Sequence, residues 1–338
     1  MLIKGLLRKS VRNMRNFKEK IKTYFLNLPK GILPVSVDPD LKVEKISGGD
    51  YNLNFKINVN GEKFLLRLNV EAQSGLKNQI MYEYKTLKFL EPYKIAPKAY
   101  YLDDSKKHFP FGLIIEEFIA GKRLEISLAS LKKLAKTLAR LHTIPLGNRN
   151  FLIRWQSPLK EQLKFVTNEF NRYRQRKIIN KEFINIGSKI INKVKSRFRV
   201  IEKKLKPTSI IHTDLVASNI IDTGYQAYLV DWEKGRIEDP SYDIAFFLCP
   251  LMNLWDWPRI LTEKEKEYFL KVYEEESGDK AIRTRINYRI HLIILHLVLW
   301  AGNRIADVKE GLISKELGRQ NYVRYRKLFD LNQLRKYL

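Results

Sequence analysis

Residues 210–222 read I-I-H-T-D-L-V-A-S-N-I-I-D, and residues 226–233 read Q-A-Y-L-V-D-W-E. An apolar pair enters a polar loop, and a second apolar run, after a turn, ends in an acidic residue. Asp214 and Asn219 are five residues apart, and Asp231 lies twelve residues beyond Asn219. These three polar residues are the point from which the rest of the chain can be interpreted.

This spacing is typical of a kinase catalytic loop. Phosphoryl transfer from ATP depends mostly on positioning and on neutralising charge, with one carboxylate at the acceptor hydroxyl and oxygen ligands on Mg²⁺. Asp and Asn oxygens suit the tight octahedral shell of magnesium. The kinase loop H-x-D-x-x-x-x-N has the same spacing and precedes a strand pair that ends in a metal-binding Asp, here in D-W-E rather than D-F-G. The alternative is a polar hairpin loop with these residues by chance, but the full register between β-type runs favours the kinase interpretation.

Length and composition limit the number of domains and the class of protein. A chain of 338 residues is long enough for two domains or one two-lobed domain, and 44% hydrophobic with 12% aromatic residues indicates a globular protein. The single cysteine, Cys249, excludes an internal disulfide, is compatible with the cytoplasm, and is expected to be buried rather than a nucleophile. The longest apolar run, 290–300, is shorter than a membrane span and predicts a buried helix. No signal-peptide pattern opens the sequence.

The charge balance is strongly basic. There are 63 Lys and Arg residues against 37 Asp and Glu, a net charge of +26 with a pI near 9.9. Residues 1–30 carry a net +8 and residues 160–206 a net +11, so the catalytic region is not unusually basic. Such a charge implies affinity for something anionic; a drift in composition towards Lys is the alternative.

Residues 1–30 predict a basic amphipathic helix that ends at Pro29. Its apolar stripe consists of Ile3, Leu7, Val11, Met14, Phe17, Ile21, Phe25 and Leu28. Such a helix either lies on an anionic membrane or another polyanion, or docks its stripe on the protein's own lobe. Docking is the commoner arrangement. The expected location is therefore cytoplasmic, with peripheral membrane contact as the alternative for this helix.

From residue 41 the apolar period changes towards two, which predicts an antiparallel five-stranded sheet. The expected strands are 41–46, 52–59, 62–68, 98–103 and 112–116, with a hairpin at Asn60-Gly61 and a helix at 76–90. Gly48 and Gly49 lie between the first two strands, where paired glycines let backbone N–H groups approach phosphates closely. A plain turn is the alternative for these glycines.

Arg67 lies where such a lobe needs a cation for the ATP phosphates, and an Arg fork can hold them bidentately. Glu83, on the following helix, is its best expected partner. By their order in the chain, Glu116 to Phe118 are expected to present backbone groups to adenine. Exposed surface residues are the alternative for Arg67 and Glu83.

The remaining sequence is mostly helical. Residues 128–142 and 151–206 predict helices, the second basic and interleaved with Phe165, Phe170 and Tyr173. Aromatic residues at helical spacing usually face a core, and no nucleic-acid motif is present, so nucleic-acid binding is disfavoured. Asp243 is expected to brace the catalytic loop. The histidines lack metal-ligand spacing, which makes zinc unexpected.

Four residues could enclose an ammonium group of a substrate. They are Trp255, Asp256, Trp257 and Trp300. Aromatic rings bind cations through their faces, and an acid would add charge complementarity. Glu233, in D-W-E, is added to this substrate group. Core packing is the alternative for each aromatic residue.

Together these residues resemble the aminoglycoside phosphotransferase and choline kinase superfamily. The matching motifs are I-S-G-G-x-x-N (46–52), F-L-L-R-L (64–68), Y-E-Y-K-T-L-K-F-L (82–90), L-A-R-L-H (138–142), H-T-D-L-V-A-S-N-I (212–220) and V-D-W-E with D-P-S-Y-D-I-A. The G-G-x-x-N loop, Arg at position 67 and the D-W-E wording lean towards the choline and ethanolamine kinases. Thr213, often Gly or Asn in the family, and Ala217, often Pro, depart from the pattern without removing a catalytic group.

The resemblance implies a role for each matching position. Asp214 would orient and deprotonate the acceptor hydroxyl, with His212 as a brace for the loop. Asn219 and Asp231 would bind Mg²⁺. The nucleotide residues would be Gly48, Gly49, Asn52, Arg67, Glu83, Glu116 and Phe118.

We therefore expect an α+β, protein-kinase-like fold with two lobes. The expected divisions are a basic helical extension (1–37), a nucleotide-binding lobe with the hinge (38–120) and a helical catalytic and substrate-binding lobe (121–338). The expected reaction is ATP- and Mg²⁺-dependent transfer to a small-molecule hydroxyl, with an amino alcohol such as choline or ethanolamine as the leading acceptor. The alternatives are an aminoglycoside, sugar or envelope-glycan kinase, and a basic nucleic-acid or membrane-binding protein that keeps the fold.

Overall fold

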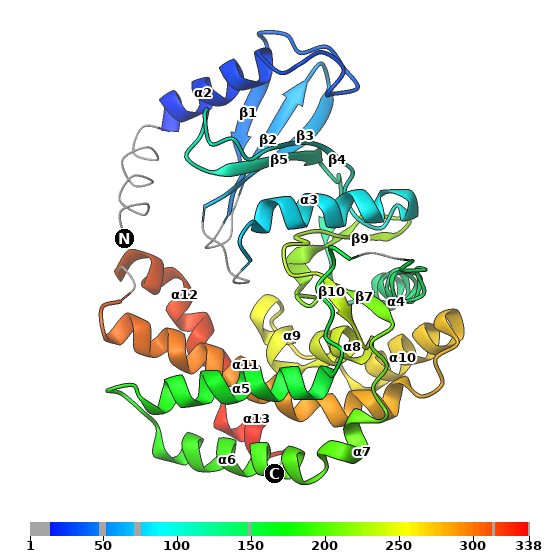
Figure 1. Ribbon diagram of the computed structural model, residues 1–338, viewed down its shortest axis with the longest axis vertical. Helices are drawn as coiled ribbons and strands as arrows, with labels where there is room; N and C mark the ends of the chain where they lie inside the picture. Colours follow the sequence, from blue (N-terminus) through cyan, green and yellow to red (C-terminus); the bar gives the residue numbers. More distant parts are fainter. Residues whose placement is uncertain (1–13, 47–51, 71–75, 148–149, 313–314, 337–338) are drawn as a thin grey trace. The chain divides into compact units, whose positions relative to one another are not determined.

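The computed structural model describes residues 14–46, 52–70, 76–147, 150–312 and 315–336 (Figure 1). By contacts within the chain, one compact unit contains residues 1–120 with 230–233, and the other contains 121–229 with 234–338. The first unit therefore includes the D-W segment that follows the catalytic loop in sequence. Each unit is described separately below.

The first unit is built on an antiparallel five-stranded sheet with the strand order β1-β2-β3-β5-β4. The strands are β1 (Lys42–Lys45), β2 (Asn52–Val59), β3 (Glu62–Asn69), β4 (Ala99–Asp103) and β5 (Gly112–Glu117). Asn60 and Gly61, both with positive φ (+52° and +88°), form the tight turn between β2 and β3. The predicted sheet and hairpin are confirmed, and helix α3 (Gln79–Leu90) begins three residues later than expected.

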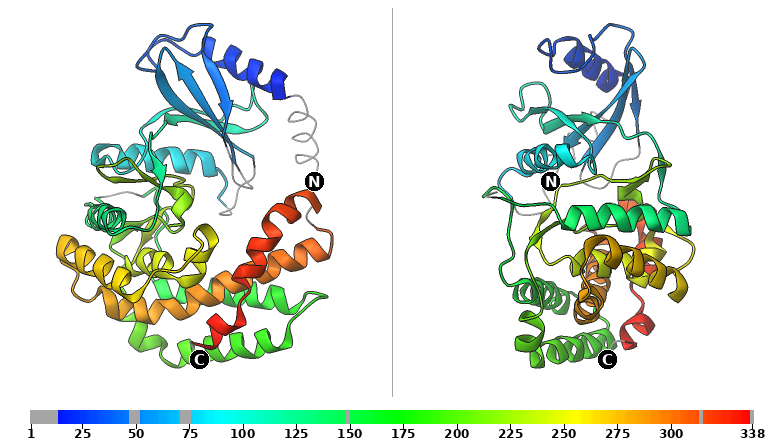
Figure 2. Two further views of the ribbon diagram at one scale, coloured as in Figure 1. Left: turned by 180° about the vertical axis from the view of Figure 1, so that it is seen from behind. Right: turned by 90° about the vertical axis from the view of Figure 1, so that its right-hand side faces the viewer.

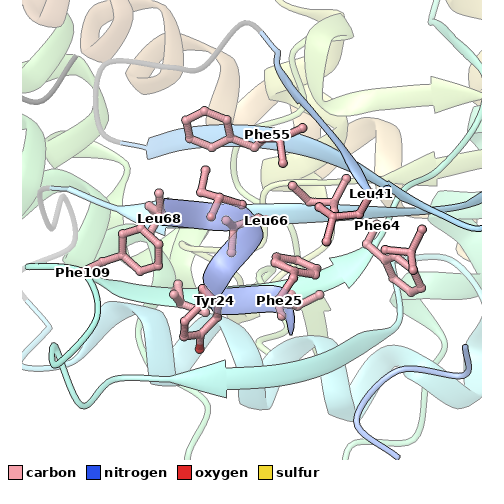
Figure 3. Packing of buried hydrophobic residues seen from close by; sticks show 14 of the residues in the cluster. Tyr24, Phe25, Leu41, Phe55, Phe64, Leu66, Leu68 and Phe109 are labelled. Carbon is pink, nitrogen blue, oxygen red and sulfur yellow. The ribbon is translucent and has the colours of Figure 1, made fainter. Parts of the chain in front are cut away.

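The two faces of the sheet carry different side chains, one apolar and one polar. This is possible because successive side chains of a strand point to opposite sides. On β3, Phe64, Leu66 and Leu68 belong to one buried apolar cluster (Figure 3). Arg67, between them in sequence, is directed to the opposite face, where its guanidinium meets Glu83 of α3. Alternation along one strand thus separates the core from the polar site.

Helix α2 (Met14–Leu26) covers the apolar face of this sheet. Its residues Phe17, Ile21 and Phe25 are buried in the same cluster as the β3 residues, and Figure 3 shows Phe25 among these side chains. The described part of the amphipathic helix therefore docks on its own lobe. The docking alternative is therefore confirmed for this part of the stripe, because its apolar residues are buried in the lobe. Ile3, Leu7 and Val11 lie outside the described residues.

The second unit is mainly helical, with two small sheets. Its helices are α4 (Leu128–His142), α5 (Pro158–Arg174), α6 (Lys181–Ser196), α7 (Phe198–Glu202), α8 (Ser241–Leu248), α9 (Pro250–Asp256), α10 (Glu263–Ser277), α11 (Ile282–Lys309), α12 (Lys315–Leu328) and α13 (Leu331–Arg335). Its strands are β6 (Lys122–Arg123), β7 (Ser209–Ile211), β8 (Ile220–Asp222), β9 (Ala227–Leu229) and β10 (Arg236–Glu238). The segment 151–206, expected to be helical, is interrupted by turns between α5, α6 and α7.

Two apolar features of the second unit are structural. Helix α11 is long and apolar enough to cross a membrane by length and composition, but 67% of its most apolar window is buried inside the protein. It packs against α5, α8 and α12, so it is a core helix here. Cys249 is fully buried, as expected, and burial raises the pKa of its thiol to about 12.

Docking of α2 predicts a stability effect. Phe25→Ala should lower the free energy of unfolding of the first unit by about 3–5 kcal/mol, because it removes a fully buried ring and leaves a cavity. Leu26→Ala, on the same helix but 44% exposed, should cost less than about 1 kcal/mol. Urea denaturation of both variants provides the measurement. Equal, small effects would contradict the docked position of α2.

Candidate active site

One buried carboxylate, Asp243, fixes the loop that carries Asp214. Asp243 lies in the first turn of α8 and is fully buried. Its two oxygens accept the backbone N–H groups of His212 and Thr213, each at 2.7 Å. His142, the last residue of α4, approaches the same carboxylate with Nε2 at 3.3 Å. The predicted bracing role of Asp243 is confirmed.

The charge state of this brace follows from its partners. Burial alone would raise the pKa of Asp243, but the hydrogen bond and charge of His142, with the charge and amide of His212, lower it below its usual range. The carboxylate is therefore ionised at neutral pH and accepts strong hydrogen bonds. The loop is anchored by a charge rather than by packing alone.

Asp214 itself is held by backbone contacts and faces a lysine. Its N–H donates to Nδ1 of the fully buried His212 at 3.3 Å, and its carbonyl oxygen accepts Nδ2 of Asn219 at 3.0 Å. His212 is thus a brace, as the family resemblance implied. Lys234 Nζ lies 3.3 Å from Asp214 Oδ2, and both side chains are about one-third exposed. The carboxylate therefore has a cationic neighbour and stays accessible.

Two residues of the candidate site have left-handed backbone conformations. Thr213 has φ +75° and Asp231 has φ +72°. Non-glycine residues rarely adopt such angles, and each costs on the order of 1–3 kcal/mol. Thr213 is stabilised there by Asp243 and by a hydrogen bond from its Oγ1 to the Lys234 carbonyl at 3.3 Å. Glycine, common in the family at position 213, would adopt this angle without strain.

The polar face of the first unit contains one guanidinium and three carboxylates. Arg67 NH1 lies 3.3 Å from Glu83 and 2.5 Å from Asp231, and its Nε lies 3.7 Å from Glu116. Arg67, Glu83 and Glu116 are almost fully buried, whereas the Asp231 side chain is 29% exposed. The structure therefore confirms the expected Arg67–Glu83 pair and adds Glu116 and Asp231 to it.

A shortage of positive charge perturbs these groups. Burial, with opposition from Arg67, raises the pKa of Glu83 well above its usual range and that of Glu116 to about 7. Burial alone would lower the pKa of Arg67, but the three carboxylates together raise it. They belong to Asp231, Glu83 and Glu116. Both Glu83 oxygens and Arg67 Nε also make no hydrogen bond within the described part of the chain. Buried polar atoms in this state are uncommon outside functional sites.

Asn52 and Glu233 form a second buried polar group in the first unit. Glu233 Oε2 accepts Asn52 Nδ2 at 3.1 Å and Gln79 Nε2 at 2.7 Å, and all three side chains are buried. Asn69 Nδ2 in turn donates to Asn52 at 3.0 Å. The sequence grouped Glu233 with the substrate residues, but its hydrogen bonds place it with the expected nucleotide residue Asn52. Gly48 and Gly49 lie outside the described residues.

The segment expected to bind adenine continues the sheet. The N–H of Glu117 donates to the Lys98 carbonyl at 2.8 Å, and the N–H of Phe118 to the Lys63 carbonyl at 3.4 Å. These two amides are therefore engaged within the lobe. Glu116 was expected to contribute backbone groups, and its side chain also joins the Arg67 cluster.

The aromatic residues expected at the substrate end separate into two sets. The rings of Trp255 and Trp300 are 5.6 Å apart, and both lie against Tyr325 of α12, at 6.3 and 5.2 Å. The guanidinium of Arg324 lies 5.1 Å from the centre of the Trp255 ring. We call Trp255, Trp300 and Tyr325 the aromatic triad; one face of it already accepts a cation.

Asp256 and Trp257 do not join this triad. Asp256 pairs with Arg123 at 2.7 Å and accepts the N–H of Ser218, beside Asn219, at 2.9 Å. Trp257 Nε1 donates to the Leu124 carbonyl at 3.0 Å. Both side chains therefore join separate segments of the second unit, and the substrate role of Asp256 stays a prediction.

Sequence reasoning missed four residues of these groups. They are Gln79, Lys234, Arg324 and Tyr325. Lys234 could have been found, since it directly follows D-W-E. Tyr325 and Arg324 gave no such signal, because 24 residues or more separate them from Trp300 and only the packing of α12 joins them to it.

Comparison with known proteins identifies the family and the fold of the chain. The sequence model of the family described as "Phosphotransferase enzyme family" matches residues 42–284. A LicA homolog of Mycoplasma capricolum is 25% identical over 252 residues, which cover 74% of this chain and 88% of that protein. An ethanolamine kinase of Plasmodium vivax has a similar structure with a TM-score of 0.68 and 22% identity, over 100% of this chain and 95% of that one. For the choline kinase LicA of Streptococcus pneumoniae the TM-score is 0.63 at 20% identity, over 96% and 100%.

The raised pKa of Glu116 predicts a pH-dependent stability without nucleotide or metal. The folded chain keeps this proton to about pH 7, whereas the unfolded chain releases it near its ordinary value of 4.5. The group's contribution to stability is therefore fully present below pH 4.5 and is lost as the pH rises towards 7. Glu116→Gln should remove this loss, on the order of 2–3 kcal/mol, so that wild type destabilises more steeply between pH 5 and 7.

Urea denaturation of both proteins across this pH range checks the prediction. Glu62→Gln, at an exposed position of β3, is the matched control and should follow the wild type. Parallel curves for wild type and Glu116→Gln would show that Glu116 is ionised in the fold.

Proposed function

We propose that this chain, which belongs to the phosphotransferase enzyme family, transfers the γ-phosphate of ATP to the hydroxyl group of a small amino alcohol such as choline or ethanolamine. The observation that carries the proposal is the loop of Asp214, anchored by the ionised Asp243 with Asn219 hydrogen-bonded to the loop. Its accessible carboxylate beside Lys234 has the character that an alcohol acceptor requires.

In this proposal Asp214 orients the acceptor hydroxyl and takes up its proton as the phosphoryl group is transferred. The braces behind the loop fix the backbone on either side of Asp214, so the carboxylate loses little freedom when the acceptor binds. Lys234 balances the negative charge of Asp214.

The donor set fits magnesium. The amide nitrogen of Asn219 is used by the Asp214 carbonyl, so its Oδ1 is the atom directed to a ligand. Asp231 offers a partly exposed carboxylate held by Arg67. Both are hard oxygen donors, as Mg²⁺ prefers, and we assign them as its protein ligands. When bound, the ion neutralises charge on the phosphates.

The residues assigned to the nucleotide belong to the first unit. Arg67, kept charged by its carboxylates, is assigned to the ATP phosphates, with Glu83 holding it in place. Asn52, fixed by Glu233, and the glycines Gly48 and Gly49 are assigned to the phosphate loop. Because the amides of Glu117 and Phe118 donate within the sheet, adenine would be recognised at 116–118 through carbonyl oxygens.

The aromatic triad supports an ammonium-bearing acceptor. Arg324 already lies against the Trp255 ring, so this face is able to bind a cation. A substrate ammonium would bind the half-buried Trp255 and Trp300 in the same way. A polycationic acceptor is less well matched, because the nearby carboxylate of Asp256 is already bound by Arg123. The names of the relatives, which include choline and ethanolamine kinases, agree with this substrate class.

The reaction predicts turnover with choline or ethanolamine. An ADP-release assay with Mg-ATP should respond to one of them more strongly than to simple sugars or aminoglycosides. Asp214→Asn should reduce kcat by roughly 10²–10⁴-fold while the affinity for Mg-ATP stays within about threefold, because it changes the acceptor's base alone. Turnover with an aminoglycoside or a sugar instead would replace the proposed acceptor. Wild-type rates in Asp214→Asn would contradict the role of Asp214.

The triad predicts that recognition depends on the positive charge of the acceptor. Wild type should prefer choline over 3,3-dimethylbutan-1-ol, its uncharged analogue of the same shape, by roughly 3–30-fold in kcat/KM. Trp255→Leu should abolish most of this preference with little change in KM for ATP. Trp257→Leu, a neighbouring Trp outside the triad, is the control and should retain the preference. A preference that survives in Trp255→Leu would exclude the triad as the ammonium site.

A further inference from the structure

Two consecutive helices of the second unit carry part of the surplus positive charge. Residues 181–206, which contain α6 and α7, hold nine basic residues and two acidic ones. Eight of the nine are exposed. We call them the α6–α7 basic face: Lys181, Lys189, Lys195, Arg197, Arg199, Lys203, Lys204 and Lys206.

These cations lack counter-charges. Of the two acids in the segment, Glu182 pairs with Arg335, and Glu202 accepts the backbone N–H of Leu159 at 2.9 Å. Within the part of the chain that the structure describes, none of the eight cations forms an ion pair. Other surface cations differ: Arg283, for example, is bound by both Glu267 and Glu274. Like charges held together without partners repel one another unless an anion binds.

The secondary structure places the cations of α6 on the solvent side of that helix. In α6, buried Phe183, Ile190 and Val194 face the core, where α6 packs against α11. Lys181 and Lys189 therefore lie on the opposite, solvent side of the helix. Helix α7 follows after a single residue, and Figures 1 and 2 show the two helices in succession along one edge of the second unit.

Exposed aliphatic side chains lie before the basic face and within it. Ile178 and Ile179, in the turn before α6, are 43% and 39% exposed, and Val200 of α7 is 59% exposed. Large aliphatic residues beside unpaired cations suit the interface of an anionic bilayer, which offers both charged head groups and an apolar layer. Nucleic acid would be favoured instead by exposed aromatic rings for base stacking. Of the segment's aromatic residues, Phe183 is fully buried and Phe198 half-buried.

We propose that the α6–α7 basic face docks the protein on an anionic lipid bilayer, with its cations on the head groups and Ile178, Ile179 and Val200 entering the interface. The apolar stripe of α2 does not take this role, because its described part is buried. Docking by the second unit would hold the phosphotransferase at a membrane surface while leaving its chemistry unchanged.

Vesicle co-sedimentation of the full chain tests the charge of the face. The protein should bind phosphatidylcholine vesicles that contain about one-third phosphatidylglycerol and should not bind pure phosphatidylcholine vesicles. Its affinity should fall at least about tenfold between 50 and 200 mM salt. A variant with Lys195, Arg197, Arg199 and Lys203 changed to Gln should bind at least about tenfold more weakly. The control changes Arg15, Lys18, Lys20 and Lys22 of α2 to Gln, which removes the same charge, and should bind like wild type.

A second variant tests the aliphatic residues, with Ile178, Ile179 and Val200 changed to Ser. It should bind the anionic vesicles several-fold more weakly but should elute from heparin like wild type, since its charge is unchanged. Circular dichroism and wild-type turnover verify that every variant is folded. The proposal is overturned if wild type ignores anionic vesicles, if the two charge variants weaken equally, or if the face prefers RNA to vesicles at matched salt.

Discussion

The candidate nucleotide site depends on one guanidinium that is shared by three carboxylates. Arg67 comes from β3, Glu83 from α3, Glu116 from β5 and Asp231 from the segment 230–233, so a single side chain collects four separate parts of the sequence. Burying one positive charge among three acids is unfavourable unless some acids stay protonated or further positive charge arrives. Burial, and after it the neighbouring carboxylates, raise the pKa of Glu116 and Glu83 against the effect of Arg67. A bound metal ion is the kind of charge that would relieve this imbalance.

The catalytic loop follows a different principle, because a carboxylate there is fully satisfied. Asp243 is saturated by two amides and a histidine, and its pKa is lowered accordingly. The energy of these contacts offsets the left-handed backbone of Thr213, which aims the next residue, Asp214. The two acids thus have different roles. The buried Asp243 positions the loop, and the accessible Asp214 is available to react.

Short-range patterns in the sequence predicted much of this. The period of two predicted the strands, and the Asn-Gly turn predicted the hairpin. The spacing from His212 to Asn219 predicted the catalytic loop. Each of these features depends on residues that are neighbours in the sequence. The sequence could not distinguish a helix that docks on its own lobe from one that binds a membrane. The packing of α2 shows docking. The aromatic triad could not be anticipated, since Tyr325 reaches Trp255 and Trp300 only through the placement of α12. The hydrogen bonds of Asp256 and Glu233 could not be predicted either, because their partners are distant in sequence.

The central claim is that phosphate passes from ATP to an alcohol held at Asp214. The most direct measurement follows the label of γ-³²P-ATP in a single turnover with excess enzyme, Mg²⁺ and choline, and identifies the products by chromatography. The account predicts that the label appears in phosphocholine, or in phosphoethanolamine when ethanolamine is supplied, and that Asp214→Asn leaves it in ATP. Label recovered only as inorganic phosphate, or retained on the protein, would contradict it.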